Sequence, residues 1–333
     1  MKLLVIEPMG IEGHIAFNKC ILSILSSIGE VTFVSSPHYL KKIETNNVRQ
    51  IPISYYSSKS KIGFRYKQIL VLKKILKTIP INTFDNVIFL GYETISMSLS
   101  WPRKIRTFVF EHNNISNAQN SFIKMFFLKY LPRNIIHLTF MEHIAEYLRR
   151  ISNREINVVP FPYCKTEGML HSYTNQMQIK NKKIIFSPSS QTPESLIGKL
   201  ITIIKDNHEY YLISKGSRVV KESNYEMKTH FDEYYSILNC ATLVFIGGDY
   251  KYRISGVVYE AFTYCKPVVM LQNEYANELK KQFPGLVYII NNLEDIIQIK
   301  VDYELLMNSY NVFERAHSNL QIEKILSGIL SIR

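Results

Sequence analysis

The sequence predicts an α/β fold with two Rossmann-like halves, each built on a mostly parallel, doubly wound sheet. Short apolar runs alternate with amphipathic helical periods along most of the chain. The alternation stops over residues 161–181, where polar residues dominate, and it restarts at Lys183–Ser187. We therefore expect an N-terminal domain over residues 1–165, a linker, and a C-terminal domain over residues 166–314.

Runs rich in apolar, β-branched and aromatic residues predict the strands of the first half. They are Leu3–Ile6, Val31–Ser35, Arg49–Ile53, Asn86–Leu90, Thr107–Phe110, Ile135–Thr139 and Asn157–Val159. Apolar residues three and four positions apart predict the helices between them. These are Ile15–Ile28, Lys61–Thr78, Ser121–Leu131 and Glu142–Ile151.

The second half repeats the same alternation of strands and helices. Its predicted strands are Lys183–Ser187, Tyr210–Ser214, Thr242–Ile246, Val268–Leu271 and Leu286–Ile290. Its predicted helices are Glu194–Lys205, Phe231–Leu238 and Val257–Tyr264, followed by a long helical pattern over Tyr303–Ile332.

The excess of positive charge lies entirely in the N-terminal half of the chain. Residues 1–165 hold 22 Lys and Arg against 10 Asp and Glu, whereas residues 166–333 hold 18 of each. No acidic residue lies between Glu44 and Asp85. A protein that is basic over one half is expected to meet an extended anionic partner there, either a nucleic acid or an anionic membrane surface.

Composition narrows the class of protein further. The content of 46% apolar and 20% charged residues is typical of a soluble globular protein, and no run has the roughly 18 apolar residues of a spanning helix. The N-terminal MKLLVIEP reads as a first strand, too short for a signal peptide. The four cysteines are far apart, without a CxxC pair or a nearby His cluster, which favours reduced thiols in the cytosol over zinc or disulfides.

The stretch Phe231–Met270 is the most informative part of the sequence. It reads as helix, apolar strand, polar loop, helix and second strand. The loop holds Lys251, Arg253, Ser255 and Gly256, and Glu260 follows about one helical turn later. Cations beside a helix N-terminus suit a diphosphate, and a carboxylate one turn on suits ribose hydroxyls. This pattern indicates a nucleotide-sugar site; an ordinary βαβ unit with a solvated Glu is the alternative.

The same stretch resembles the donor-binding segment of retaining GT-B glycosyltransferases, especially the family 4 enzymes of bacterial capsule, lipopolysaccharide and exopolysaccharide synthesis. The resemblance rests on Ser255-Gly256-Val257-Val258-Tyr259-Glu260-Ala261 and on the strand Lys266-Pro267-Val268-Val269. It implies two Rossmann-like domains that face each other across a cleft. It also implies that a C-terminal helix, about residues 315–333, packs back on the N-terminal domain.

The resemblance assigns the donor ribose to Glu260 and brings Gly256, Val257 and Ser255 to the donor site. The family usually carries a second Glu eight residues earlier, which contacts the sugar, and Tyr252 stands at that position here. Donor-sugar recognition is therefore not carried over to this chain. No two aspartates are spaced two residues apart, so the metal-binding Asp-x-Asp of the other large glycosyltransferase fold is absent and no metal or other cofactor is implied.

Polar residues follow the apolar strand that ends at Phe110. Glu111, His112 and Asn113 emerge at its carboxyl end, where such residues contact a ligand or cap the next helix. The resembled enzymes place a His-Asp or His-Asn pair here, against the donor sugar. We expect His112 to be a hydrogen-bonding group for the sugar, and Glu111 to stand beside it as a second candidate catalytic residue.

Two further strand-end loops belong to the expected site. Gly10-Ile11-Glu12-Gly13-His14 follows the first strand, and Gly13 and His14 face the transferred sugar and acceptor in the resembled family; a plain turn is equally compatible. The loop after Ser187 offers the hydroxyls of Ser189, Ser190 and Thr192 for a diphosphate, or for capping the next helix. It lacks the Arg of many relatives, so Lys251 and Arg253 are expected to supply the charge. Lys215-Gly216 reads as a simple turn.

A basic amphipathic segment, Tyr55–Lys77, predicts a membrane-facing or acceptor-facing surface. Its cations alternate with apolar and aromatic residues. The cations assigned to this surface are Lys59, Lys61, Arg65, Lys67, Lys73 and Lys74. A similar aromatic and basic piece lies at Phe122–Tyr130. For both, the alternative is a helix that buries its apolar face and solvates its lysines.

These observations predict a glycosyltransferase that moves a sugar from a nucleotide-sugar donor to a lipid-linked glycan, such as a polyprenyl-diphosphate acceptor. The sequence has no Gly-x-Ser-x-Gly, no HExxH and no P-loop. Retention of configuration and bacterial surface polysaccharide synthesis follow from the resemblance alone. We expect a cytoplasmic enzyme, peripheral on the inner face of the cell membrane, that binds no nucleic acid. A basic nucleic-acid-binding α/β protein, a nucleotide-sugar epimerase and a non-catalytic GT-B scaffold are the alternatives.

Overall fold

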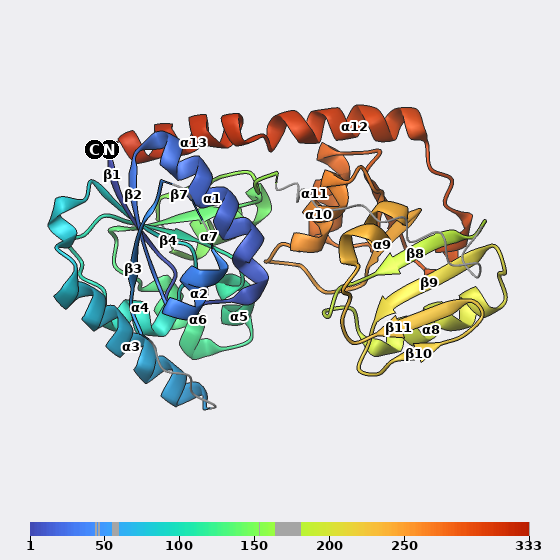
Figure 1. Cartoon of the computed structure of the whole chain (residues 1–333), viewed down its shortest axis with the longest axis horizontal. Helices are drawn as coiled ribbons and strands as arrows, with labels where there is room; N and C mark the ends of the chain where they lie inside the picture. Colours follow the sequence, from blue (N-terminus) through green and yellow to red (C-terminus); the bar gives the residue numbers. More distant parts are fainter. Residues whose placement is uncertain (44, 46, 55–59, 153, 164–180, 333) are drawn as a thin grey trace. The chain divides into compact units, whose positions relative to one another are not determined.

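A computed structural model describes residues 1–43, 45, 47–54, 60–152, 154–163 and 181–332. The chain forms two compact units (Figure 1). The first unit contains Met1–Pro162, Tyr252–Ile254 and His317–Arg333, and the second contains Tyr163–Lys251 and Ser255–Ala316. Most of the expected linker, residues 164–180, lies outside the described residues.

The first unit is built on a sheet of seven parallel strands in the order β3-β2-β1-β4-β5-β6-β7. The strands are β1 Lys2–Ile6, β2 Glu30–Ser35, β3 Arg49–Pro52, β4 Asn86–Phe89, β5 Thr107–Phe110, β6 Ile135–Thr139 and β7 Ile156–Val158. The central strands are buried almost throughout, as expected for a parallel sheet covered on both faces. Strand β1 is an inner strand, in which Leu3 pairs with Val31 of β2 and with Asn86 of β4.

Helices cover both faces of this sheet (Figure 1). They are α1 Ile15–Ile28, α2 Pro37–Lys42, α3 Lys61–Thr78, α4 Thr94–Ser100, α5 Asn114–Gln119, α6 Phe122–Lys129, α7 Glu142–Ser152 and α13 Asn319–Ser331. Serine side chains cap four of them, α2, α3, α6 and α13; Ser60, for example, accepts a hydrogen bond from the Gly63 amide, and Ser121 accepts one from the Lys124 amide. Each satisfies a backbone donor that the first turn of a helix leaves free.

The second unit is also doubly wound. Its strands are β8 Lys183–Ser187, β9 Tyr210–Lys215, β10 Val220–Lys221, β11 Tyr225–Lys228, β12 Leu243–Ile246, β13 Val268–Leu271 and β14 Val287–Ile290. Their order is β10-β11-β9-β8-β12-β13-β14, and every pairing is parallel except that between β10 and β11. The helices are α8 Glu194–Lys205, α9 Tyr234–Cys240, α10 Gly256–Thr263, α11 Glu274–Gln282 and α12 Tyr303–Ala316.

Each sheet has one point where the direction of strand order reverses. In the first unit this switch lies between β1 and β4, and in the second it lies between β8 and β12. The loops that follow these four strands leave the carboxyl edge of the sheet in opposite directions, which opens a crevice where open α/β proteins bind ligands. The predicted α/β class with doubly wound sheets is confirmed.

The C-terminal segment completes the first unit. Helix α13 packs against α1, and the Asn86 side chain donates a hydrogen bond of 3.1 Å to the Leu330 carbonyl. The helical pattern over Tyr303–Ile332 is divided into α12 and α13, because Ser318 caps a new helix by accepting from the Gln321 amide. The expected packing of the C-terminal helix on the N-terminal unit is confirmed.

The docking of α13 makes a first prediction. Leu326 is 1% exposed, whereas Leu320 on the same helix is 62% exposed. Leu326→Ala should lower the free energy of unfolding by about 2–5 kcal/mol, because it leaves a cavity beside α1. Leu320→Ala should change it by less than about 0.5 kcal/mol. Urea denaturation measures the free energy of unfolding of both variants, with the slope of this free energy against urea concentration held at the wild-type value. Equal effects of the two variants would contradict the packing described.

Candidate functional site

The first unit has a pocket of about 210 Å³ at the carboxyl edge of its sheet. Loops after three neighbouring strands contribute to it: His14 follows β1, Tyr92 follows β4, and His112 follows β5. The pocket therefore lies beside the switch point between β1 and β4. His14 and His112, both expected at the site, are brought together here.

The two histidines stack on each other. Their ring centroids lie 4.1 Å apart, and Phe17 contacts His112 edge-on at 4.8 Å. Burial lowers the pKa of His14 to about 4 and holds the pKa of His112 well below its ordinary value. Both rings are therefore neutral at physiological pH. They offer hydrogen bonds to a ligand rather than positive charge.

The backbone fixes the tautomer of His112. Its Nε2 lies 3.0 Å from the carbonyl oxygen of Leu90. A carbonyl only accepts hydrogen bonds, so Nε2 carries the proton and Nδ1 is the acceptor. His112 thus presents an acceptor suited to a hydroxyl group.

Glu111 does not face this pocket, contrary to the expectation that it stands beside His112. Its side chain is buried, and its Oε1 accepts from the Tyr92 hydroxyl and from His137 Nδ1, which is 2.6 Å away. Successive residues of an extended chain point to opposite sides, so His112 faces the pocket and Glu111 faces the interior. The Tyr92-Glu111-His137 cluster ties together the ends of β4 and β5 and the middle of β6.

A second buried carboxylate, Glu7, holds the loop after β1. It accepts hydrogen bonds from the amides of Met9 at 2.9 Å and Gly10 at 3.1 Å, and from the Asn18 side chain at 3.4 Å. Gly10 has a φ of 61°, a conformation that glycine adopts readily. Burial raises the pKa of Glu7. The sequence analysis missed this anchor, although a charged residue directly after an apolar strand was a signal for it.

The second unit has a pocket of about 360 Å³, also at the carboxyl edge of its sheet. Pro188 follows β8 and Lys215 ends β9, while α9 and the segment before it provide an aromatic wall. The lining residues are Pro188, Lys215, His230, Phe231, Tyr234, Tyr235, Val257 and Glu260. Of the expected donor residues, the structure places Val257 and Glu260 in this pocket.

The Glu260 carboxylate is hydrogen-bonded to one of the aromatic side chains. The Tyr234 hydroxyl donates a hydrogen bond to Glu260 Oε2. Burial raises the pKa of Glu260, and the bond from Tyr234 acts in the opposite direction. One oxygen of the carboxylate is thereby oriented, while the residue still lines the pocket. Lys215, which the sequence analysis treated as a turn residue, adds a cation to the same pocket.

The hydroxyl-rich loop after β8 connects to the loop after β12. Ser189 Oγ lies 2.9 Å from the Tyr250 hydroxyl, and Thr192 Oγ1 accepts from the Gly247 amide at 3.2 Å. A Cβ at Gly247 would stand 2.9 Å from Thr192 Cγ2, so a larger residue there would displace the Thr192 side chain. Ser189 and Thr192 therefore hold the two loops of the switch point together, whereas Ser190 is exposed.

The remaining expected residues occupy separate positions. Lys251 is exposed, and the Ser255 amide donates to the Tyr275 hydroxyl at 3.3 Å. Gly256 begins α10 with open space around its Cα, and Gly13 is equally open. Tyr252 and Arg253 group with the first unit. Within the described ranges, no three His, Cys, Asp or Glu side chains gather in a way that would hold a metal ion.

Proteins of known structure share the architecture of this chain. No family model matches the chain, and no curated protein matches it. Its two doubly wound units, with a C-terminal helix returned to the first, have the GT-B fold of glycosyltransferases. This fold extends over the whole chain.

Three solved structures illustrate the likeness. HepE of Anabaena, solved with UDP and glucose, gives a TM-score of 0.75 at 12% identity and covers 100% of both chains. Sucrose-phosphate synthase of Thermosynechococcus elongatus gives 0.70 at 13% identity, covering 99% of this chain and 98% of that one. WaaG, a glycosyltransferase involved in lipopolysaccharide biosynthesis, gives 0.64 at 11% identity and covers 100% of both. At these identities the similarity establishes the fold.

The neutral histidine pair predicts a specific pH dependence of stability. A histidine whose folded pKa is depressed to about 4 destabilises the fold as pH falls below 6.5, because the unfolded chain takes up the proton first. When the pH is lowered from 7 to 5, the free energy of unfolding of the wild type should fall by about 2 kcal/mol more than that of His14→Gln. Chemical unfolding at the two pH values measures this difference.

The matched control for this prediction is His38→Gln. The His38 side chain is 76% exposed and lies outside the pocket. This variant should follow the pH dependence of the wild type. Identical pH dependence of His14→Gln and the wild type would contradict a buried, neutral His14.

Proposed function

We propose that the protein is a glycosyltransferase that uses a UDP-sugar as donor. The observation that carries the proposal is the pocket of the second unit, where Glu260, Tyr234 and Lys215 meet at the carboxyl edge of a doubly wound sheet. A buried carboxylate beside aromatic rings suits a nucleoside: Glu260 accepts from the ribose hydroxyls, and the rings of the α9 wall contact the base. HepE, which has the same fold, was solved with UDP and with UDP-glucose.

The diphosphate of the donor is assigned to the N-terminus of α10. Backbone amides at a helix N-terminus and the helix dipole both favour a phosphate. Gly256 leaves this end of the helix open, and Lys251 and Arg253 precede it in the sequence. Because Ser189 and Thr192 already bond to the neighbouring loop, we assign them to shaping the phosphate site rather than to contacting the phosphate.

We assign the sugar-binding role of the first unit to His112. With Nε2 bonded to the Leu90 carbonyl, its Nδ1 is available to accept a bond from a sugar hydroxyl. His14 stacks on it and, together with Phe17, holds the ring in place. In the reaction proposed, the bond between the anomeric carbon and the diphosphate oxygen breaks, and the acceptor oxygen bonds to that carbon from the same face while its proton passes to the departing phosphate oxygen, so configuration is retained. No strong general base is required for this route.

The acceptor is proposed to be a lipid-linked glycan that reaches the first unit at a membrane surface. A groove of about 710 Å³ runs between the start of α3 and α6. It shares Phe64, Glu93, Asn117 and Lys124 with the histidine pocket, so the two are continuous. An acceptor lying in the groove would therefore lead to His112.

The exposed surface of α3 supports the membrane part of this proposal. Ile62, Tyr66 and Leu70 form an exposed apolar stripe at a spacing of four residues, although the opposite face of the helix packs in the core. Lys61, Lys73 and Lys74 are exposed, Lys67 is half-buried, and Arg65 pairs with Glu93 at 3.4 Å. Lys59 lies outside the described residues. A helix of this kind can lie on anionic headgroups.

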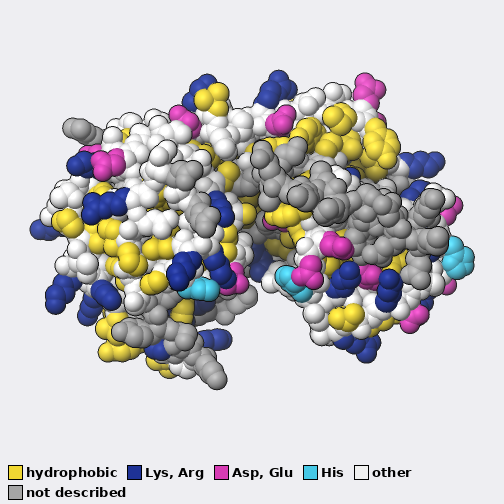
Figure 2. Space-filling model, in the orientation of Figure 1, with side chains coloured by type: hydrophobic (Ala, Val, Ile, Leu, Met, Phe, Trp, Pro, Cys, Tyr) yellow, Lys and Arg dark blue, Asp and Glu magenta, His cyan; other side chains and the backbone are white. Residues whose placement is uncertain are grey.

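The location proposed is the inner face of a bacterial cell membrane, in surface polysaccharide synthesis. Lys and Arg side chains are spread over the face of the first unit that Figure 2 shows, with fewer acidic side chains among them. In the part of the chain that the structure describes, no helix combines the length and the apolar character needed to span a bilayer. Association through the α3 surface would be peripheral.

The donor assignment predicts the effect of removing one carboxylate. Glu260→Ala should weaken UDP binding by about 10- to 150-fold, the effect of losing hydrogen bonds to a charged group. Glu294→Ala, an exposed carboxylate change in the same unit, should leave UDP binding unchanged. Isothermal titration with UDP measures both variants. Undiminished affinity in a folded Glu260→Ala variant would contradict the ribose assignment.

The pH dependence of UDP binding in the companion variant Tyr234→Phe sharpens this test. The carboxylate form of Glu260 binds the ribose, so affinity falls as pH drops through its raised pKa. Removing the Tyr234 hydroxyl raises that pKa further, and the fall should begin at a higher pH than in the wild type. A purely structural role for Tyr234 would lower affinity equally at all pH values.

A further inference from the structure

A pocket of about 770 Å³ in the first unit lies at the opposite edge of the sheet from the histidines. Arg133 and Arg154 each lie two residues before a strand, β6 and β7 respectively. Arg103 comes from the segment before β5, Lys129 from the end of α6, and Arg150 from the last turn of α7. The pocket thus collects the amino ends of three parallel strands and the carboxyl ends of two helices.

Five cations line this pocket without an acidic side chain among its lining residues. None of the five forms an ion pair with a carboxylate in the described part of the chain. The dipoles of α6 and α7 each place roughly half a negative charge at a carboxyl end. Two such ends offset about one of the five positive charges. The remaining excess favours an anionic ligand.

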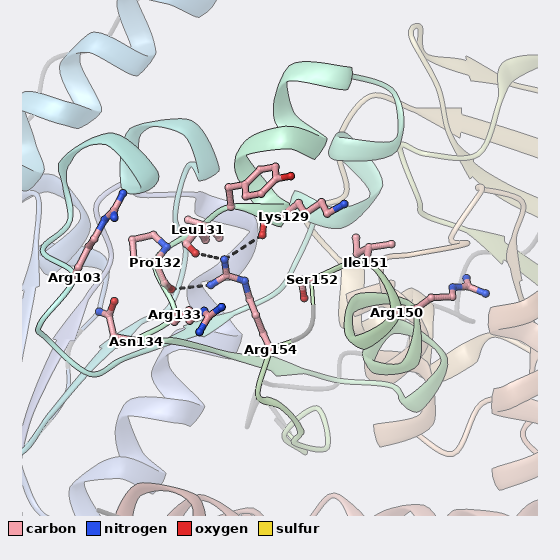
Figure 3. Close-up of a pocket in the computed structure, with 11 residues that line it drawn as sticks. Arg103, Lys129, Leu131, Pro132, Arg133, Asn134, Arg150, Ile151, Ser152 and Arg154 are labelled. Atoms are coloured by element: carbon pink, nitrogen blue, oxygen red, sulfur yellow. Dashed lines mark hydrogen bonds between the residues drawn. The ribbon is translucent and has the colours of Figure 1, made fainter.

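Arg154 has a structural role, because its guanidinium is hydrogen-bonded to the backbone. Its guanidinium donates to the carbonyl oxygens of Lys129 at 3.1 Å and Pro132 at 2.7 Å, and also to that of Leu131 (Figure 3). These bonds fix the turn between α6 and β6, yet they leave the positive charge in place because carbonyls are neutral. Burial lowers the pKa of Arg154, and the charge of Arg133 acts in the same direction.

Arg133 is the cation most clearly left for a ligand. Figure 3 shows its side chain beside that of Arg154 within the pocket, with Arg103 to one side and Lys129 and Arg150 to the other. Arg133 and Arg103 are exposed and make no hydrogen bond in the described part of the chain. The guanidinium groups of Arg133 and Arg154 lie side by side, and without a carboxylate they repel each other unless an anion lies nearby. Their planar forks match the oxygens of a phosphate.

The rim of the pocket indicates where that phosphate comes from. Tyr130 lines the pocket, is exposed, and packs on Phe126 at 4.7 Å between ring centroids. Phe122, which is 87% exposed, and Ile123 continue this apolar face along α6. Exposed aromatic residues next to cations are typical of the boundary between lipid headgroups and acyl chains. A soluble phosphate ester has no acyl chains that would contact such an apolar face.

We propose that this pocket binds the phosphate of an anionic phospholipid headgroup, while the exposed face of α6 inserts among the neighbouring lipids. Arg133 and Arg103 contact the phosphate, and Arg154 adds charge behind them. The site is distinct from the histidine pocket and the donor pocket, and the proposal does not depend on the sugar-transfer function. It adds a headgroup site to the peripheral contact of α3.

The test is co-sedimentation of the whole chain with vesicles of phosphatidylcholine that contain 30% phosphatidylglycerol, at about physiological ionic strength. Arg103→Gln with Arg133→Gln should lower the partition coefficient by about 30-fold, the factor expected for two cations at an anionic surface. Lys281→Gln with Lys300→Gln removes the same charge from exposed positions of the second unit and should change it by less than about 2-fold. Equal effects of the two double variants would overturn the proposal.

Two further experiments test the role of α6 and distinguish a lipid phosphate from a soluble phosphate ester. Phe122→Ser with Phe126→Ser should also lower partitioning, and unchanged partitioning would overturn the lipid source. Glycerol 3-phosphate should not raise the melting temperature of the wild type at constant ionic strength. Stabilisation by glycerol 3-phosphate that is lost in the Arg103→Gln, Arg133→Gln variant would assign the pocket to a soluble phosphate ester instead. A cooperative thermal unfolding transition near that of the wild type confirms that each variant is folded.

Discussion

Buried polar groups at the ends of parallel strands are the constraint on which both candidate sites depend. A carboxylate or hydroxyl that leaves water must be hydrogen-bonded, and the cheapest partners at a strand end are the amides and side chains of the next loop. Glu7 satisfies this condition with the amides of Met9 and Gly10, and Glu111 satisfies it at its Oε1, which accepts from Tyr92 and His137. The loops that present His14 and His112 are therefore fixed before any ligand binds.

In the second unit, neutral side chains form the hydrogen bonds between the loops that follow the strands. Thr192 accepts from the Gly247 amide, and Ser189 bonds to the Tyr250 hydroxyl. These contacts join the loops on the two sides of the switch point between β8 and β12. Glu260 is the carboxylate left facing the pocket, with Tyr234 holding one of its oxygens. Preorganisation of this kind lowers the ordering that binding requires.

The alternation of apolar runs was enough to predict the fold class and most long elements, because buried parallel strands and amphipathic helices have distinct periods. Short helices such as α4 and α5, and the β10–β11 hairpin, were not predicted, since they hold too few residues to show a period. Helix α9 begins at Tyr234 rather than Phe231, which leaves Phe231 free to line the pocket.

Side-chain direction limited the prediction of the sites. His14, His112 and Glu260 line strand-end pockets, where motifs that follow apolar strands mark the carboxyl edge. Glu111 was expected beside His112, but one residue of extended chain reverses the direction of a side chain. Lys215 was treated as a turn, and the five cations of the basic pocket are scattered over residues 103–154. Only the tertiary structure brings such residues together.

Charge divides the first unit into two environments. Its carboxyl edge presents neutral histidines, whose burial keeps them unprotonated, whereas α3, α6 and the opposite edge carry the cations. Lys124 of α6 lines the histidine pocket as well, so one cation also reaches this edge.

The most direct measurement is a thermal-shift series with UDP, GDP, ADP, CDP and dTDP, each with and without magnesium. If the second unit holds a uridine diphosphate site, UDP at 100 times its dissociation constant should stabilise the fold by about 2.7 kcal/mol, with or without magnesium. The other nucleotides should have smaller effects at the same concentration. No stabilisation by any of the five would contradict the donor site and with it the account of a nucleotide-sugar-dependent enzyme.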